Sequence, residues 1–345
     1  MNKSTKIFSL PINPYMDENY FNKTFIPFLE LNHLYIFDMY MTAHIAPFNT
    51  DAMGGMFDDK SLLEQLDFYQ YICQDYNIPI TAVFNNISVD MTIENLDIFI
   101  ENFKPLYDNG IHRIILPFEH WVLTGKLQKE FPNLYIKNTI INRISDPQDI
   151  YNTAKSGYDF IYVDRNVMRD LDTLEMYPIL KEKIKKDFNK DIKLALLINE
   201  NCIGRCNLQQ EHYLFNNAKT DMGYFSDPIS NNSCMKWKKQ DPAYMLKGAS
   251  LYPSILELER MLEYFDVFKL HGRDDWGTFE ASLALVNNYR LKNKSLAPIR
   301  EKGLNYLLRD DEKIINKYLE VTQNCKFQCW NCSFCDDNVI KIKGK

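Results

Sequence analysis

LYIFDMYMT (34–42) is a run of aromatic and branched residues, and the segments after it in the chain indicate a repeating architecture. A helical pattern comes next, SLLEQLDFYQYICQDY (61–76), and then a second strand-like run, ITAVFNN (80–86). Short apolar runs of this kind are typical of buried strands, whereas apolar spacing of three and four is typical of helices. A strand, a helix and a strand in this order predict two parallel strands joined by a right-handed crossover.

The same alternation continues along the chain. Strands are expected over 34–42, 80–86, 112–118, 134–142, 160–166, 192–200, 248–253 and 267–274, and helices over 61–76, 93–110, 121–132, 146–157, 172–188, 255–265 and 279–291. Eight such units predict an α/β fold, a closed (β/α)8 TIM-like barrel. The alternative is an open doubly wound sheet, which would carry a glycine-rich phosphate loop after its first strand, and none is present.

Three regions of the chain follow from this pattern. Residues 1–32 are expected to be an N-terminal extension, 33–292 the barrel with an insertion at 201–247, and 293–345 a C-terminal tail. The tail is expected to hold a helix over about 305–322 and then a cluster of cysteines.

Composition restricts the class of protein. The net charge of −6 and the pI of about 5.6 argue against nucleic acid as a partner. The sequence has neither a secretory signal nor an apolar run of about 18 residues, so we expect a cytoplasmic protein without a membrane span. In that compartment the eight cysteines are expected to be metal ligands or catalysts rather than disulfides.

Polar residues gather where the expected strands end. In a barrel of parallel strands the chemistry sits at the carboxyl ends, so these side chains predict a site for a small polar or anionic substrate. The alternative is that some of them only satisfy loop backbone or pair with one another. The residues are Asp38, Tyr40, Asn85, Asn86, Glu119, His120, Lys137, Asn138, Asn142, Asp164, Arg165, Asn199, Glu200, Lys269, His271 and Arg273.

The sharpest catalytic candidates are His271 and Arg273, in KLHGRDD. An arginine can hold a carboxylate or phosphate through two hydrogen bonds, and a histidine can transfer protons near neutral pH. Asp164, Arg165 and Glu200 are further candidates at two other strand ends. The alternative is that these charged side chains pair with one another and so only hold the strand ends of the barrel together.

Seven of the eight cysteines form two groups. The tail sequence NCKFQCWNCSFCDD (324–337) holds four within eleven residues, and the insertion after the sixth strand holds three. Four sulfurs so close in sequence suit an iron–sulfur cluster better than a zinc ion, which usually takes two well-separated CxxC pairs. A 4Fe–4S cluster, one or two per chain, is therefore expected, with zinc as the alternative. The candidate ligands are Cys202, Cys206, Cys234, Cys325, Cys329, Cys332 and Cys335.

The segment NENCIGRC (199–206), followed by Cys234, resembles the collagenase-like peptidase family. That family includes iron–sulfur barrel proteins that hydroxylate ubiquinone precursors or RNA bases without oxygen. The resemblance implies that Cys202, Cys206 and Cys234 ligate a 4Fe–4S cluster. The fourth ligand would come from the tail, or from His212 or Glu200 if the tail holds a second cluster.

Three functions are consistent with these features. The first is an iron–sulfur enzyme that performs redox or group-modification chemistry, with an electron donor or partner subunit, and with His271, Arg273, Asp164 and Arg165 around the substrate. The second is a peptidase or other hydrolase, although the sequence contains neither HExxH nor GxSxG. The third is a non-catalytic, zinc-stapled barrel whose tail docks a partner protein through Phe327, Trp330 and Phe334.

Overall fold

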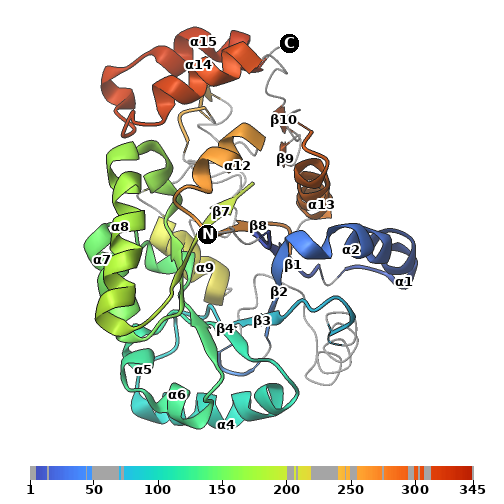
Figure 1. Ribbon diagram of the computed structural model, residues 1–345, viewed down its shortest axis with the longest axis vertical. Helices are drawn as coiled ribbons and strands as arrows, with labels where there is room; N and C mark the ends of the chain where they lie inside the picture. The colour runs from blue at the N-terminus through green and yellow to red at the C-terminus, as the bar shows by residue number, and fades with distance from the viewer. Residues whose placement is uncertain are drawn as a thin grey trace.

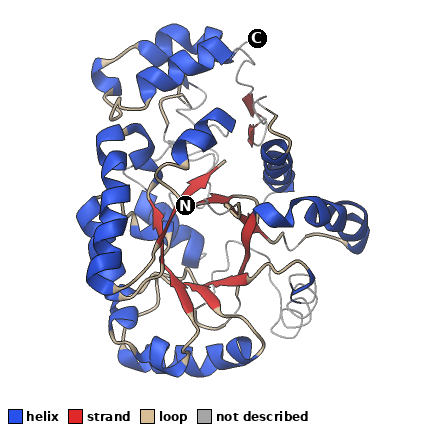
Figure 2. Ribbon diagram, viewed as in Figure 1, coloured by secondary structure: helices blue, strands red, loops and turns tan. Residues whose placement is uncertain are grey.

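The computed structural model describes residues 5–13, 15–43, 45–48, 70, 74–199, 206, 209–218, 240–244, 246–248, 255–273, 276–293, 299–301, 304–306 and 312–343. Within these ranges the parallel strands β1 to β8 pair in chain order and close on themselves (Figure 1, Figure 2). The predicted (β/α)8 barrel is therefore confirmed. Its strands are β1 Phe8–Pro11, β2 Ile36–Thr42, β3 Ile80–Val83, β4 Arg113–Ile115, β5 Tyr135–Lys137, β6 Phe160–Val163, β7 Lys193–Ile198 and β8 Val267–Leu270.

The identity of one strand differs from the prediction. β1 pairs with β2 on one side and with β8 on the other, so the barrel begins before residue 33 and includes part of the expected extension. β7 pairs directly with β8, and no described residue of the strand expected at 248–253 takes part in the barrel. Of that segment, 249–253 lies outside the described residues. β1 was not predicted from the sequence because four residues that end in proline give only a weak strand signal. β1 becomes a strand through its pairing with β2 and β8.

The helices follow the expected order. The segment from Pro147 to Ser156 illustrates the local causes, because Asp146 caps its first turn by accepting a hydrogen bond from the backbone of Gln148. Gly157 ends it at φ +122°, and a Cβ there would lie 2.9 Å from Val122 Cγ1. The described helices are α1 Glu18–Tyr20, α2 Ile26–Asn32, α4 Ile93–Asp108, α5 Glu119–Leu123, α6 Lys126–Glu130, α7 Pro147–Ser156, α8 Leu171–Phe188, α9 Gln209–Ala218, α12 Ile255–Met261, α13 Trp276–Arg290, α14 Glu312–Thr322 and α15 Phe334–Lys343.

The barrel wall separates two apolar regions. Side chains alternate along each strand, so residues such as Phe8 and Leu10 face the surrounding helices, while the intervening positions face the lumen. The lumen holds its own buried cluster, contributed by six strands. Its members are Tyr40, Val83, Ile115, Phe160, Tyr162, Ala195 and Val267.

The tail folds as a helical pair at one edge of the molecule, where α14 and α15 lie beyond α12 (Figure 1). α14 begins at Glu312, later than the expected helix over 305–322, because residues 304–306 belong to a short antiparallel pair, β9 Ile299–Glu301 and β10 Leu304–Tyr306. No helix in the described ranges is both long enough and apolar enough to cross a membrane.

Candidate functional site

Two cations meet one aromatic ring at the carboxyl end of the barrel. Lys269 lies two residues after Val267 on β8 and therefore also faces the lumen, where its Nζ is 4.3 Å from the centroid of the Tyr40 ring. The guanidinium carbon of Arg273 is 5.3 Å from the same ring. Both side chains are buried. A cation over the face of a tyrosine ring is attracted by the negative charge of that face.

The turn after β8 fixes the position of Arg273. Arg273 Nη1 donates a hydrogen bond to Thr42 Oγ1 over 2.7 Å. Gly272 has φ +129°, and a Cβ at this position would lie 2.6 Å from the backbone of Phe279 at the start of α13. Buried Asn13 donates to the Gly272 carbonyl over 3.0 Å. Only glycine fits this turn, and the turn aims Arg273 across the mouth toward β2.

The backbone of His271 is held by hydrogen bonds on both sides. Its amide donates to Asn199 Oδ1 over 2.8 Å, and its carbonyl accepts from Ser282 Oγ over 2.6 Å. Asn199 Nδ2 donates to the same Ser282 Oγ over 2.8 Å. Asn199 adopts φ 52°, a left-handed conformation that asparagine tolerates better than most residues. The ends of β7 and β8 are thus joined, with the half-buried His271 side chain between the end of β8 and Arg273.

The structure gives Asp164 and Arg165 well-defined contacts. Asp164 caps the 3₁₀ helix Arg165–Arg169 by accepting from the Asn166 amide over 2.8 Å, and its other oxygen is 3.9 Å from Arg143 Nε. Arg165 is buried and donates to the Tyr213 hydroxyl of α9 over 3.0 Å. These contacts hold the 3₁₀ helix and α9 in place, and a catalytic role for either residue stays a prediction.

Several expected strand-end residues belong to the barrel interior instead. Lys137 Nζ donates to Asp38 Oδ2 across the lumen, and neither side chain is exposed to solvent. Thr81 Oγ1 donates to the same Asp38 oxygen over 2.5 Å, and Arg113 Nη1 lies 3.8 Å from it. Asp38 and Lys137 are therefore a buried ion pair and do not line the substrate mouth.

Burial and neighbouring charges lower the pKa values of both members of this pair. Burial alone would raise the pKa of Asp38, but the charges of Lys137 and Arg113 outweigh it and lower that pKa. Burial lowers the pKa of Lys137 to about 8, although the Asp38 carboxylate opposes the change. Both groups are charged at neutral pH.

Other strand-end residues satisfy backbone groups. The side chain of Asn138 accepts from the Tyr162 amide over 2.5 Å, and Asn142 donates to the Pro117 carbonyl over 3.0 Å. Glu119 lies in the first turn of α5 and accepts from Ser156 Oγ. For these residues the alternative of loop pairing describes the observed contacts.

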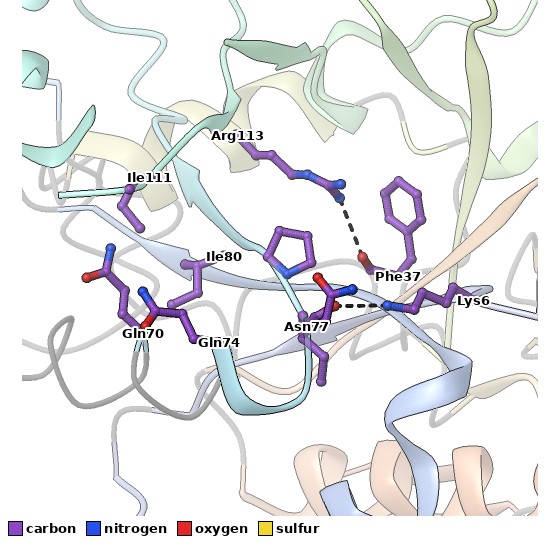
Figure 3. Close-up of a pocket in the computed structure, with 11 residues that line it drawn as sticks. Lys6, Phe37, Gln70, Gln74, Asn77, Ile80, Ile111 and Arg113 are labelled. Carbon is purple, nitrogen blue, oxygen red and sulfur yellow. Dashed lines mark hydrogen bonds between the residues drawn. The ribbon is translucent and has the colours of Figure 1, made fainter. Parts of the chain in front are cut away.

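A cavity of about 640 Å³ opens at the opposite end of the barrel (Figure 3). Lys6, which precedes β1, and Ile80 and Arg113, which begin β3 and β4, line it. Lys6 donates to the Asn77 carbonyl over 2.9 Å, and Arg113 donates to the Phe37 carbonyl over 3.4 Å (Figure 3). In barrels of this kind the amino end serves stability and the carboxyl end serves chemistry, so volume alone does not make this cavity the active site.

The four tail cysteines converge on one pocket. Cys325, Cys329, Cys332 and Cys335 all line a hollow of about 240 Å³ together with Arg169 and Lys247. Cys329 and Cys332 are exposed, and the other two are half-buried; none forms a disulfide. Burial raises the pKa of Cys335 to about 11, against the opposing charge of Arg169. The four thiols thus lie around one hollow, and their role as cluster ligands stays a prediction.

Arg169 is a residue of this pocket that no sequence pattern singled out. It ends the 3₁₀ helix after β6, is buried, and lies with Nη1 4.0 Å from Cys325 Sγ. Its Nη2 donates to the Leu246 carbonyl over 2.8 Å and to the Tyr318 hydroxyl over 2.7 Å. Arg169 and Cys325 are 156 positions apart, so no local pattern links them.

The loop cysteines are described only in part. Cys206 is half-buried and its carbonyl accepts from the Gln209 amide over 3.2 Å at the start of α9. Cys202, Cys234 and Glu200 lie outside the described residues, as does the side chain of His212. Within the described ranges no three His, Cys, Asp or Glu side chains form a group that could hold a metal ion as they stand. The loop ligand set therefore stays a prediction.

Comparison with known proteins finds distant similarity to two proteins. No protein-family model matches the chain. Over 187 residues, 50% of this chain, it is 23% identical to the uncharacterized protease MJ1657 of Methanocaldococcus jannaschii, and the matched part spans 56% of that protein. The solved structure of the U32 peptidase Mk0906 aligns with 77% of this chain and 94% of its own, with a TM-score of 0.47 and 13% identity. The chain is thus a (β/α)8 barrel with distant sequence similarity to a protein named as a protease.

Proposed function

We propose that this chain is a barrel enzyme of the collagenase-like, U32 peptidase type, which hydrolyses a peptide at the carboxyl end of the barrel. The substrate is a peptide with a carboxylate near the bond to be cleaved. Support comes from the similarity to a protein named as a protease and from the polar character of the mouth. The residue pattern left open two kinds of enzyme, an iron–sulfur enzyme and a hydrolase. The similarity to a protein named as a protease favours the hydrolase.

The observation that carries the proposal is the pair of buried cations against Tyr40. Lys269 and Arg273 approach one ring from two positions, 4.3 and 5.3 Å from its centroid. Arg273 offers a planar set of donors that matches a carboxylate. A peptide carboxylate bound there would hold the chain across the mouth, next to the turn that carries His271.

Hydrolysis at this position would use His271 as the proton-transfer group. In this proposal His271 accepts a proton from a water molecule as the water oxygen bonds to the peptide carbonyl carbon. The C–N bond then breaks, and the proton passes to the leaving amine. The new carboxylate forms beside Arg273 and Lys269, whose positive charge stabilises it.

The test compares peptides that differ only in their terminal charge. The purified chain is incubated with matched peptides ending in a carboxylate or in an amide, and the products are identified by mass spectrometry. Cleavage should favour the carboxylate peptide, and Arg273→Met should remove that preference. Lys104→Met is the matched control, since Lys104 pairs with Asp108 on the exposed surface of α4. Cleavage with no preference, or a preference that survives Arg273→Met, would refute the role of the mouth cations.

A second candidate is the iron–sulfur enzyme, and the four-thiol pocket is the observation that favours it. In that function clusters on the tail and loop cysteines would supply redox or group-modification chemistry, and an electron donor or partner subunit would supply electrons. His271 and Arg273 would then position a small anionic substrate. The two candidates separate on one measurement, because a hydrolase keeps its activity after complete removal of iron and the iron–sulfur enzyme loses it.

A further inference from the structure

We infer that the four tail cysteines form a separate binding site for a 4Fe–4S cluster, in which Arg169 is the buried positioning cation, and that the bound cluster holds the tail on the barrel. This inference does not rest on the proposed function, since it concerns a different part of the chain. It would hold for a hydrolase and for a redox enzyme alike.

The backbone of the tail brings the thiols to one place. Cys325 follows α14, and the next two residues, Lys326 and Phe327, adopt left-handed φ values of 49° and 56°. The chain therefore reverses sharply, and a 3₁₀ turn at Cys329–Asn331 leads into α15, which carries Cys335 in its first turn. Four ligands thus face one hollow within eleven residues.

The surroundings of the hollow suit a group with net negative charge. A cluster held by four thiolates needs compensating positive charge where water is excluded. Arg169 provides it 4.0 Å from Cys325 Sγ, and its Tyr318 and Leu246 hydrogen bonds fix its orientation. Lys247 lines the same hollow and pairs with Asp336 over 2.6 Å. Residues that orient and neutralise a metal site in this way change its affinity although they do not ligate.

The size of the hollow favours a cluster over a single zinc ion. Four sulfurs bound to one Zn²⁺ at about 2.3 Å would be drawn to about 3.8 Å from one another. The thiols instead line a space of about 240 Å³. A polynuclear cluster occupies such a space without collapse of the loop around it.

The site lies where the tail meets the barrel. The Lys326 amide donates to the Arg169 carbonyl over 2.9 Å, and Asn324 accepts from the Leu171 amide over 3.1 Å. Lys326 Nζ also pairs with Asp172 over 2.6 Å. These contacts join the ligand loop to the 3₁₀ helix after β6 and to the first turn of α8. A cluster that binds only the folded ligand loop stabilises this docked arrangement by mass action.

Metal analysis of two cysteine variants tests the site. The chain is purified anaerobically, and iron, acid-labile sulfide and zinc are measured per chain, with an absorption spectrum and, after reduction, an electron paramagnetic resonance spectrum. Cys202→Ser/Cys206→Ser/Cys234→Ser should keep about four irons and four sulfides on the tail. Cys329→Ser/Cys332→Ser should lose that amount relative to the unsubstituted chain. Cys73→Ser, a substitution outside both cysteine groups, is the control and should lose none.

Three results would overturn the inference. They are zinc without sulfide on the tail, no metal on the triple variant, and loss of all iron in both variants, which would mean one cluster shared by the two groups. Circular dichroism and thermal unfolding of each variant show whether it is folded. None of these outcomes depends on peptide cleavage, so the proposed function is tested separately.

Two further measurements, which do not rely on the cysteine variants, test the role of Arg169 and the docking of the tail. Arg169→Gln should release iron to a chelator about 10-fold faster than the unsubstituted chain, and Arg169→Lys should fall between the two. Removal of the cluster should speed hydrogen exchange in the ligand loop and α15, while exchange in the barrel strands should stay unchanged. Equal release rates in the Arg169 variants, or unchanged exchange in the tail, would show that Arg169 and the cluster do not hold the tail.

Discussion

The ion pair inside the barrel allows a quantitative test of the forces that hold the lumen together. Asp38 and Lys137 have no solvent exposure, and they are 99 positions apart on β2 and β5. Breaking a buried pair by removing one partner typically costs about 3–5 kcal/mol, because the other charge is left without compensation. The two partners differ in the groups that remain beside them, so the two single substitutions should differ in cost.

Lys137→Met leaves Asp38 with two partners. Arg113 Nη1 is 3.8 Å from the carboxylate, which corresponds to about 4 kcal/mol of attraction at an effective dielectric constant near 20. Thr81 still donates over 2.5 Å. We therefore expect Lys137→Met to lower the free energy of unfolding by about 3 kcal/mol, the low end of the range for a broken buried pair. Asp38→Asn leaves Lys137 buried beside an amide and near the like charge of Arg113, so its loss should approach about 5 kcal/mol.

The assay is urea unfolding of both single variants and of Asp38→Asn/Lys137→Met, followed by circular dichroism. The double variant removes both charges, so its loss should be at least about 2 kcal/mol smaller than the sum of the single losses. The reasoning would be refuted by additive losses within about 0.5 kcal/mol, or by a larger loss in Lys137→Met than in Asp38→Asn.

The pH dependence of stability checks the same pair. The pKa of Lys137 is about 8 in the folded chain and close to its usual 10.5 in the unfolded chain. Between these values the unfolded chain binds one more proton, so the free energy of unfolding should rise with pH, by up to about 1.4 kcal/mol per unit. Lys137→Met should lack this rise. At the acid end, the lowered pKa of Asp38 means that its contribution is lost as the pH falls through its folded-state value.

Substitutions at three other positions test the mouth of the barrel. Gly272→Ala should destabilise the chain by more than about 2 kcal/mol in thermal or urea unfolding, because its Cβ would lie 2.6 Å from the Phe279 backbone at φ +129°. An unchanged midpoint would contradict the close approach. Asn199→Ala should cost about 2 kcal/mol, since it loses the hydrogen bonds to His271 and Ser282 and keeps φ 52°; Asn199→Gly, which relieves only the backbone, should cost less. Under the proposed function, Arg273→Lys should raise KM for a carboxylate peptide about 10-fold with a smaller change in kcat, and a fall in kcat alone would argue against a binding role.

Local sequence signals were sufficient to predict the fold class and most of the strands and helices. The helix from Pro147 to Ser156 begins and ends where Asp146 and Gly157 predicted, because caps act within one turn of the backbone they satisfy. The buried strands between such helices also show as apolar runs. The dense spacing of the tail cysteines predicted a shared site, and the backbone reversal at Lys326 and Phe327 brings the four thiols to one hollow.

The sequence by itself therefore determined the alternation of strands and helices, the parallel strands that this alternation requires, and the presence of four cysteines in one short segment. Only the tertiary structure decided that Phe8–Pro11 is a barrel strand, that Asp38 and Lys137 neutralise each other, and that Arg169 reaches Cys325. The physical reason is the distance along the chain over which each kind of interaction acts. Caps, turns and periodicity act over a few residues, whereas strand pairing and charge compensation in a closed barrel join groups that become neighbours only when the barrel closes.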